Sequence, residues 1–166
     1  YDVPALYFDV KNGGTETTTI KTLQVDLDST TNISAVKLYD GATLLSSKAA
    51  ASAVNFTNLD FTLPANTQKT LTVKYDLAAN TTGTLGVATL DYDETVAVSP
   101  SGDDVAESGA NVTGPTIYAD TKVPTLAFVN SSITITPDST GTEADAELKF
   151  NVTANGGDLY FAKNNH

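Results

Sequence analysis

The chain has 166 residues, a formal net charge of −11 at pH 7, nine lysines, no arginine and no cysteine. Nucleic-acid surfaces are bound by clustered Lys and Arg, so this balance argues strongly against a nucleic-acid partner. No run approaches the roughly 18 apolar residues that span a bilayer, so we expect no membrane insertion in this segment. The length allows one domain, or one domain and part of another, and the start at Tyr1 rather than Met suggests a mature form or an excised fragment.

Apolar residues alternate with polar ones along most of the chain, and no stretch has helical periodicity. We expect the first strands over Ala5–Lys11, Thr17–Leu27, Ile33–Asp40, Thr43–Ser47, Val54–Leu63, Lys69–Leu77, Thr84–Tyr92, Thr95–Ser99 and Thr116–Ala119. Within Val54–Leu63, Phe56 and Phe61 fall on opposite faces, which predicts a bulge near Asn58. Turn residues recur every 8–12 residues or so, a spacing typical of sandwiches. The sequence therefore predicts an all-β, Ig-like antiparallel β-sandwich over residues 1–120.

A second, smaller β module is predicted over residues 121–166. The stretch ADTKVPTL forms a polar turn that ends in Val-Pro, and strands are expected at Leu126–Thr136, Ala146–Thr153 and Asp158–Ala162. Three strands are too few to close a sandwich. We therefore expect this module to pack on the first domain, to continue in a longer parent chain, or to be completed by another subunit.

Two pairs of similar segments within the chain favour a repeated module. Val3–Phe8 (VPALYF) is similar to Val123–Phe128 (VPTLAF), and Leu6–Gly14 (LYFDVKNGG) is similar to Leu148–Gly157 (LKFNVTANGG). The two pairs require different offsets, so they cannot both mark one repeat register.

Residues 33–77 carry a more specific resemblance. The order ISAVKLYDGATLL, then FTNLDFTLPANTQKTLTVKYDL, then a Val-Pro linker, resembles the Ig-like modules repeated in large bacterial and archaeal surface proteins, both S-layer-like and adhesin-like. The resemblance implies an extracellular structural or adhesive module at the cell surface and carries no catalytic residues. The Cys…Trp…Cys pattern of antibody domains is absent.

The sequence offers little for catalysis. His166 is the only histidine and is the last residue, which removes Ser-His-Asp and Cys-His arrangements and histidine-based metal sites. No phosphate-loop, dinucleotide-binding or HExxH motif occurs. Paired carboxylates can serve a glycosidase, but the absence of Trp argues against a sugar platform. We expect a non-enzymatic protein.

Acidic residues form the only predicted metal site. Asp91 and Asp93 share one side of an expected strand end, Glu94 can fold back at the turn, and Asp120 lies in the linker. Calcium prefers several oxygen ligands of this kind. Further acids that can contribute are Asp26, Asp28, Asp103 and Asp104. The opposing interpretation is that all of these are solvated turn residues or guards of edge strands.

Two covalent modifications are also open. An isopeptide crosslink needs a buried Lys beside an Asn or Asp, and Lys37 or Lys74 with Asn55, Asn58 or Asn151 are the candidates, although Lys74 is expected on a polar face. Glycan attachment is open at the Asn-x-Ser/Thr sites, which are Asn32, Asn55, Asn80, Asn111, Asn130 and Asn151.

Two functions follow. The first is a structural module of an extracellular surface layer, filament or stalk, joined to neighbouring copies or adjacent domains of the same surface protein by strand addition after Lys122. The alternative is an adhesive or carbohydrate-binding module that uses loops at one end of the sandwich. Its candidate contact residues are Tyr1, Tyr7, Tyr39, Tyr92, Tyr118 and Tyr160.

Overall fold

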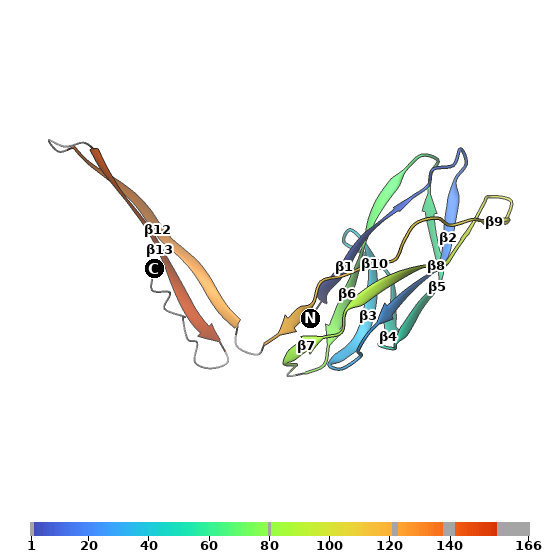
Figure 1. Cartoon of the computed structure of the whole chain (residues 1–166), viewed down its shortest axis with the longest axis horizontal. Coiled ribbons are helices and arrows are strands. Elements are labelled where there is room, and N and C mark those ends of the chain that lie inside the picture. The colour runs from blue at the N-terminus through green and yellow to red at the C-terminus, as the bar shows by residue number, and fades with distance from the viewer. Residues whose placement is uncertain (1, 80, 121–122, 138–141, 156–166) are drawn as a thin grey trace. The chain divides into compact units, whose positions relative to one another are not determined.

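The structure is a computed structural model that describes residues 2–79, 81–120, 123–137 and 142–155 (Figure 1). The chain divides into two compact units, residues 1–119 and 120–166, and each is considered by itself. The described residues form antiparallel strands and no helix, and two sheets pack together in the first unit. The predicted all-β antiparallel sandwich is therefore confirmed.

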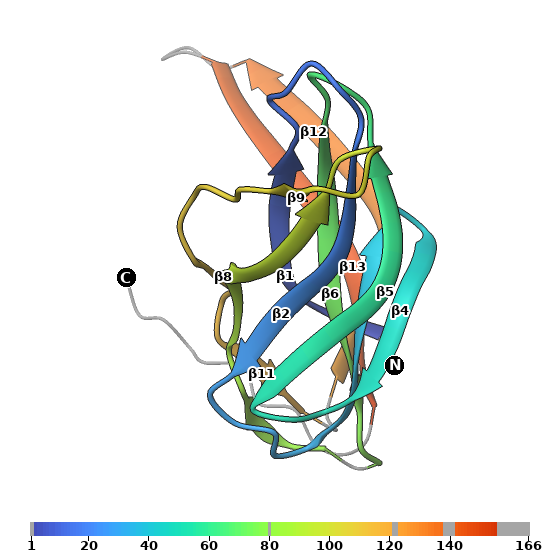
Figure 2. The same cartoon turned by 90° about the vertical axis from the view of Figure 1, so that its right-hand side faces the viewer.

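The first unit contains eleven strands. One sheet has the order β1-β6-β3-β4, and the other has the order β10-β8-β2-β5 with β9 also paired to β8. Figure 2 shows β8, β2 and β5 side by side. The bounds are β1 Asp2–Lys11, β2 Thr18–Leu27, β3 Ile33–Asp40, β4 Thr43–Ala49, β5 Ala53–Leu63, β6 Gln68–Leu77, β7 Gly83–Leu85, β8 Ala88–Val98, β9 Asp104–Val105, β10 Val112–Thr113 and β11 Ile117–Ala119. The last of these pairs with β7.

Alternation along each strand builds the core between the two sheets. Leu71, Val73 and Tyr75 of β6 point inward and are each 0% exposed, opposite Phe56 and Val25 of the other sheet, which are also 0% exposed. Burying one side chain of this size stabilises the fold by about 1.5–3 kcal/mol. The first unit therefore has a hydrophobic core of its own.

The bulge predicted near Asn58 is confirmed. The register of β2 against β5 shifts between Ile20 and Thr22, and the residues opposite that shift include Asn58 and Asp60, which have φ angles of 57° and 50°. Asparagine and aspartate tolerate this left-handed region better than branched residues do. The extra residues let Phe56 and Phe61 both reach the core, where they are 0% and 7% exposed.

The predicted boundary between the strands Thr84–Tyr92 and Thr95–Ser99 is wrong. Strand pairing is interrupted at Gly86, between β7 and β8, and β8 then continues through the acidic stretch to Val98. A Cβ on Gly86 would lie 1.9 Å from the backbone oxygen of Ser29, so only glycine fits there. The buried hydroxyl of Tyr75 donates to the Gly86 carbonyl at 2.8 Å, and this hydrogen bond holds the backbone of Gly86 against the core.

The described part of the second unit forms a hairpin of two long strands, β12 (Val123–Pro137) and β13 (Thr142–Asn155). They include the predicted strands Leu126–Thr136 and Ala146–Thr153, whereas the predicted strand Asp158–Ala162 lies outside the described residues. The register shifts between Phe128 and Asn130, so Val129 is an extra residue on β12.

The bulge at Val129 decides which residues share a face of the hairpin. Residues directly opposite in an antiparallel pair point to the same side. Leu126 and Phe128 precede the bulge and Ile133 and Ile135 follow it at an odd spacing, so an unbroken strand would place the two pairs on opposite faces. With the bulge, all four lie on one face.

Candidate functional site

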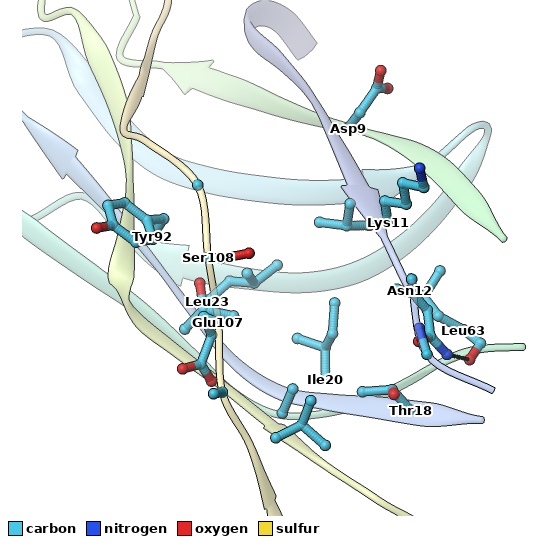
Figure 3. A pocket seen from close by; sticks show the side chains of 18 of the residues that line it. Asp9, Lys11, Asn12, Thr18, Ile20, Leu23, Leu63, Tyr92, Glu107 and Ser108 are labelled. Carbon is cyan, nitrogen blue, oxygen red and sulfur yellow. Dashed lines mark hydrogen bonds between the residues drawn. The ribbon is translucent and has the colours of Figure 1, made fainter. Parts of the chain in front are cut away.

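An open cavity of about 560 Å³ lies along one side of the sandwich in the first unit (Figure 3). It lies between β1, the edge of one sheet, and β8 with its short partners β9 and β10 at the edge of the other. Its walls include core residues as well as polar ones, and Figure 3 shows Ile20 between the segment that carries Glu107 and the strand that carries Lys11, with Leu23 beside Glu107. We call this cavity the edge groove.

The edge groove exists because the sandwich is not closed by strand pairing on this side. No described strand pairs with the outer edge of β1. The chain returns across the opening as residues 106–111, which pair only at their two ends, where β9 meets Ala97–Val98 and β10 meets Thr89–Leu90. An unpaired edge over an accessible apolar floor can accept an extended chain or an apolar ligand.

Asn12 fixes one end of the groove. The residue is 7% exposed, and its amide nitrogen donates to the carbonyls of Glu16 at 2.7 Å, Leu63 at 3.0 Å and Pro64 at 3.2 Å. Its amide oxygen accepts from the backbone N–H of Gly14 at 2.9 Å. One side chain thus ties the end of β1 to the loop that follows it and to the end of β5, and no polar atom of that amide is left unsatisfied.

A polar cluster lies on the outer face of the sheet β1-β6-β3-β4. The Lys37 ammonium lies 2.8 Å from one Asp2 oxygen and 3.1 Å from an Asp76 oxygen, and the Tyr39 hydroxyl donates to the second Asp2 oxygen at 2.7 Å. The hydrogen bonds from Lys37 and Tyr39 lower the pKa of Asp2 below its usual value. The Lys74 ammonium lies 4.1 Å from the centre of the Tyr39 ring, a cation–π contact.

The isopeptide candidates are not brought together in the described residues of the first unit. Lys37 is paired with carboxylates and Lys74 lies over an aromatic ring, on the polar face expected for it. Asn55 and Asn58 are exposed, and neither forms a hydrogen bond with a lysine of the described residues. Asn151 belongs to the second unit.

Asp93 and Glu94 lie in a bulge within β8, and Asp91 is paired beside it, so these predicted calcium ligands are not at a strand end. Thr22 pairs with Val96 and Gln24 pairs with Asp91, so the four residues 92–95 face one position of β2. Asp93 and Glu94 are exposed there, and the hydrogen bond between Tyr92 and Asp93 raises the pKa of Tyr92. Asp120 belongs to the second unit. Across the described ranges, no three acidic or histidine side chains gather in a metal-binding group.

The hairpin of the second unit carries an apolar face whose large side chains are exposed. The residues on this face of β12 and β13 with a large side chain more than half exposed are Leu126 (65%), Phe128 (67%), Ile133 (72%), Ile135 (63%), Leu148 (64%) and Phe150 (53%). We call these six residues the hairpin face. Monomeric proteins rarely leave such a contiguous apolar surface open to water.

Sequence reasoning found neither the groove nor the hairpin face. The groove depends on the path of residues 99–112 past β1, and that glycine- and serine-containing stretch has no periodicity to reveal it. The hairpin face did leave a signal, because Ala144, Ala146, Leu148, Phe150 and Val152 alternate with polar residues without a break. What the sequence left open was whether anything covers that face.

Comparison of the chain with protein-family models, with curated proteins and with solved structures found no match. The resemblance to Ig-like surface modules therefore stays a prediction. Within the described part of the chain, no helix is long and apolar enough to cross a membrane.

The polar cluster gives a testable pH dependence. Because the pKa of Asp2 is lower in the folded chain than in the unfolded chain, its stabilising contribution is complete above about pH 4 and is lost as the pH falls through the folded pKa. Lys37→Gln removes the main cause and should flatten this acid limb. The measurement is the free energy of unfolding from urea titrations between pH 2 and 7.

The matched control for this experiment is Lys48→Gln, which removes the same charge from a strand position of β4 outside the cluster. It should retain the acid limb of the parent chain. If the free energy of unfolding falls equally steeply below pH 4 in the parent chain and in Lys37→Gln, Lys37 is not the cause of the lowered Asp2 pKa.

Calcium at Asp91, Asp93 and Glu94 stays a prediction with a direct test. Calcium binding to the folded chain alone should raise the melting temperature relative to EDTA, since a ligand that binds only the native state stabilises it. Asp91→Asn with Asp93→Asn should abolish that rise, whereas Glu16→Gln with Glu107→Gln, two exposed carboxylates outside the predicted site, serves as the control of equal charge. A melting temperature identical in millimolar Ca²⁺ and in EDTA rules this site out.

Proposed function

We propose that the chain is a non-enzymatic structural module of an extracellular surface layer, filament or stalk, in which the hairpin joins neighbouring copies or domains by strand addition. The observation that carries the proposal is the hairpin itself. Its two strands are long, and among the described residues no third strand pairs with the outer edge of either one. A two-stranded hairpin is marginally stable alone in water, so it needs a partner.

The first unit supports the same role. It has its own core and two packed sheets, which is what a rigid spacer in a tandem array requires. The acidic composition without Cys, Met or Trp leaves little to oxidise, in keeping with an exposed location outside the cell. The resemblance of residues 33–77 to repeated surface modules points the same way. A free strand edge supplies main-chain hydrogen bonds, which need no particular side chain on the partner.

Removal of residues 122–166 tests the proposal. We expect the full chain to form assemblies larger than a dimer as its concentration rises, seen by light scattering and electron microscopy. The shortened chain should stay monomeric and keep the melting temperature of the first unit, because the core lies wholly before residue 120. If the shortened chain assembles as the full chain does, the hairpin is not the joining element.

A second candidate function, adhesion through carbohydrate binding, is favoured by the edge groove. The groove is large enough for a small ligand, and Tyr92 lies at its wall (Figure 3). Tyr92 itself is half-buried, and the exposed tyrosines among the described residues are on separate strands, Tyr7 on β1 and Tyr118 on β11, so these described residues form no shared platform.

The binding alternative predicts hits on a glycan array. Tyr92→Ala should weaken any such hit, because it removes the aromatic wall of the groove. Tyr118→Ala, at a residue 76% exposed and outside the groove lining, should leave it unchanged. An array without hits counts against this function and leaves the structural role standing.

A further inference from the structure

The two faces of the hairpin differ completely in chemistry. Along β13 the residues of one face are Ala146, Leu148, Phe150 and Val152, and the alternate residues are Asp145, Glu147, Lys149, Asn151 and Thr153. Their partners on β12 follow the same division, because Ile133 lies opposite Ala146, and Thr134 lies opposite Asp145. Ser131 is the one polar partner on the apolar side, opposite Leu148.

Charge separates the faces further. Lys149 lies 3.0 Å from Glu147 on the polar face, and Asp145 is on that face too. The apolar face carries no charged residue. Two copies of a chain with a net charge of −11 repel one another at most orientations. They meet without burying a charge or opposing like charges when their uncharged hairpin faces come together.

The apolar area is sufficient for a specific contact between two copies. Side chains of this size remove on the order of 100 Å² each from water when they are covered. The six residues of the hairpin face therefore offer roughly 600 Å² per copy, or about 1,200 Å² for two copies, which is the lower end of the range for specific protein interfaces. The bulge at Val129 keeps this area continuous, since it returns Ile133 and Ile135 to the face of Leu126 and Phe128.

We propose that the hairpin faces of two copies pack against each other and form a symmetric four-stranded sandwich that holds the chain as a dimer. Two aligned sheets pack about 10 Å apart with their inner side chains interdigitated. A two-fold axis makes the contact self-complementary, so each copy supplies the same residues. Ser131 lies between Phe128 and Ile133 along β12 and is enclosed in this contact, whereas its neighbour Ser132 faces solvent on the polar side.

This dimer rests on the proposed assembly role of the hairpin but uses a different part of it. Face-to-face packing covers the side chains, and strand addition uses the outer edges of β12 and β13. Both can occur in one assembly. The dimer can also form when no strand is added, so the two proposals fail separately.

The first test is the oligomeric state of the full chain by sedimentation equilibrium from 1 to 100 µM. We expect the first association step to be from monomer to dimer, with the larger assemblies made by strand addition growing from that dimer as the concentration rises. Ile133→Lys places two charges in the symmetric contact and should raise the dissociation constant at least about tenfold. Thr134→Lys adds the same charge one residue away, opposite Asp145 on the polar face, and should leave the dissociation constant unchanged.

The second test does not depend on a disruptive substitution. Because the chain has no cysteine, Ser131→Cys and Ser132→Cys each introduce one thiol on adjacent residues of opposite faces. At 100 µM the thiol of Ser131→Cys should react with a maleimide many-fold more slowly than that of Ser132→Cys, and dilution to 1 µM should remove the difference. The monomer–dimer equilibrium of both variants is measured alongside.

Three results overturn the proposal. A chain that stays monomeric at 100 µM with both thiols equally reactive has a hairpin face covered by nothing. A protected Ser131→Cys thiol in a monomer shows that the chain covers this face itself. A dimer with both thiols equally reactive is held by another surface. If the chain forms the dimer with a protected Ser131→Cys thiol but no assembly larger than a dimer, the proposed strand addition is wrong and the proposed dimer stands.

Discussion

The structure depends on one property of the β-strand, which is that successive side chains point to opposite faces. Apolar residues at alternate positions therefore gather on one face of the strand, and that face is stable when another element packs against it. In the first unit the two sheets cover each other, and Val36, Phe56 and Tyr75 reach zero exposure between them. In the second unit the same pattern occurs on a hairpin, and its apolar side chains stay exposed.

Bulges keep this property intact where the spacing of the sequence would break it. The bulge around Asn58 brings Phe56 and Phe61 to the same core, and the bulge at Val129 brings Phe128 and Ile133 to the same face. A bulge leaves an extra residue unpaired in the ladder, and burying or aligning the large side chains offsets that loss. The bulge of residues 92–95 in β8 does the opposite, since it turns Asp93 and Glu94 out to solvent.

The two candidate surfaces differ in what they ask of a partner. The edge groove lies in a unit whose core is already formed, and Asn12 fixes one end of the groove by hydrogen bonds. The first unit therefore needs no ligand in the groove for its stability. The hairpin face lies on a sheet of only two described strands and its large side chains are exposed, so a partner contributes stability as well as contact. This difference is why the assembly role rests on the hairpin and the binding alternative rests on the groove.

The sequence by itself determined the fold class, most strands and the inward faces of β2 and β6, because period-two alternation is a local property of the chain. It also predicted the bulge near Asn58 from an odd spacing of two phenylalanines. Only the tertiary structure decided that the strand breaks at Gly86, since that break is set by the close approach of Ser29 and the hydrogen bond from Tyr75, which come from other parts of the chain. The opening beside β1 and the exposure of the hairpin face were likewise tertiary outcomes. Alternation tells which side of a strand needs a cover, but the presence of the cover depends on residues far away along the chain or on another molecule.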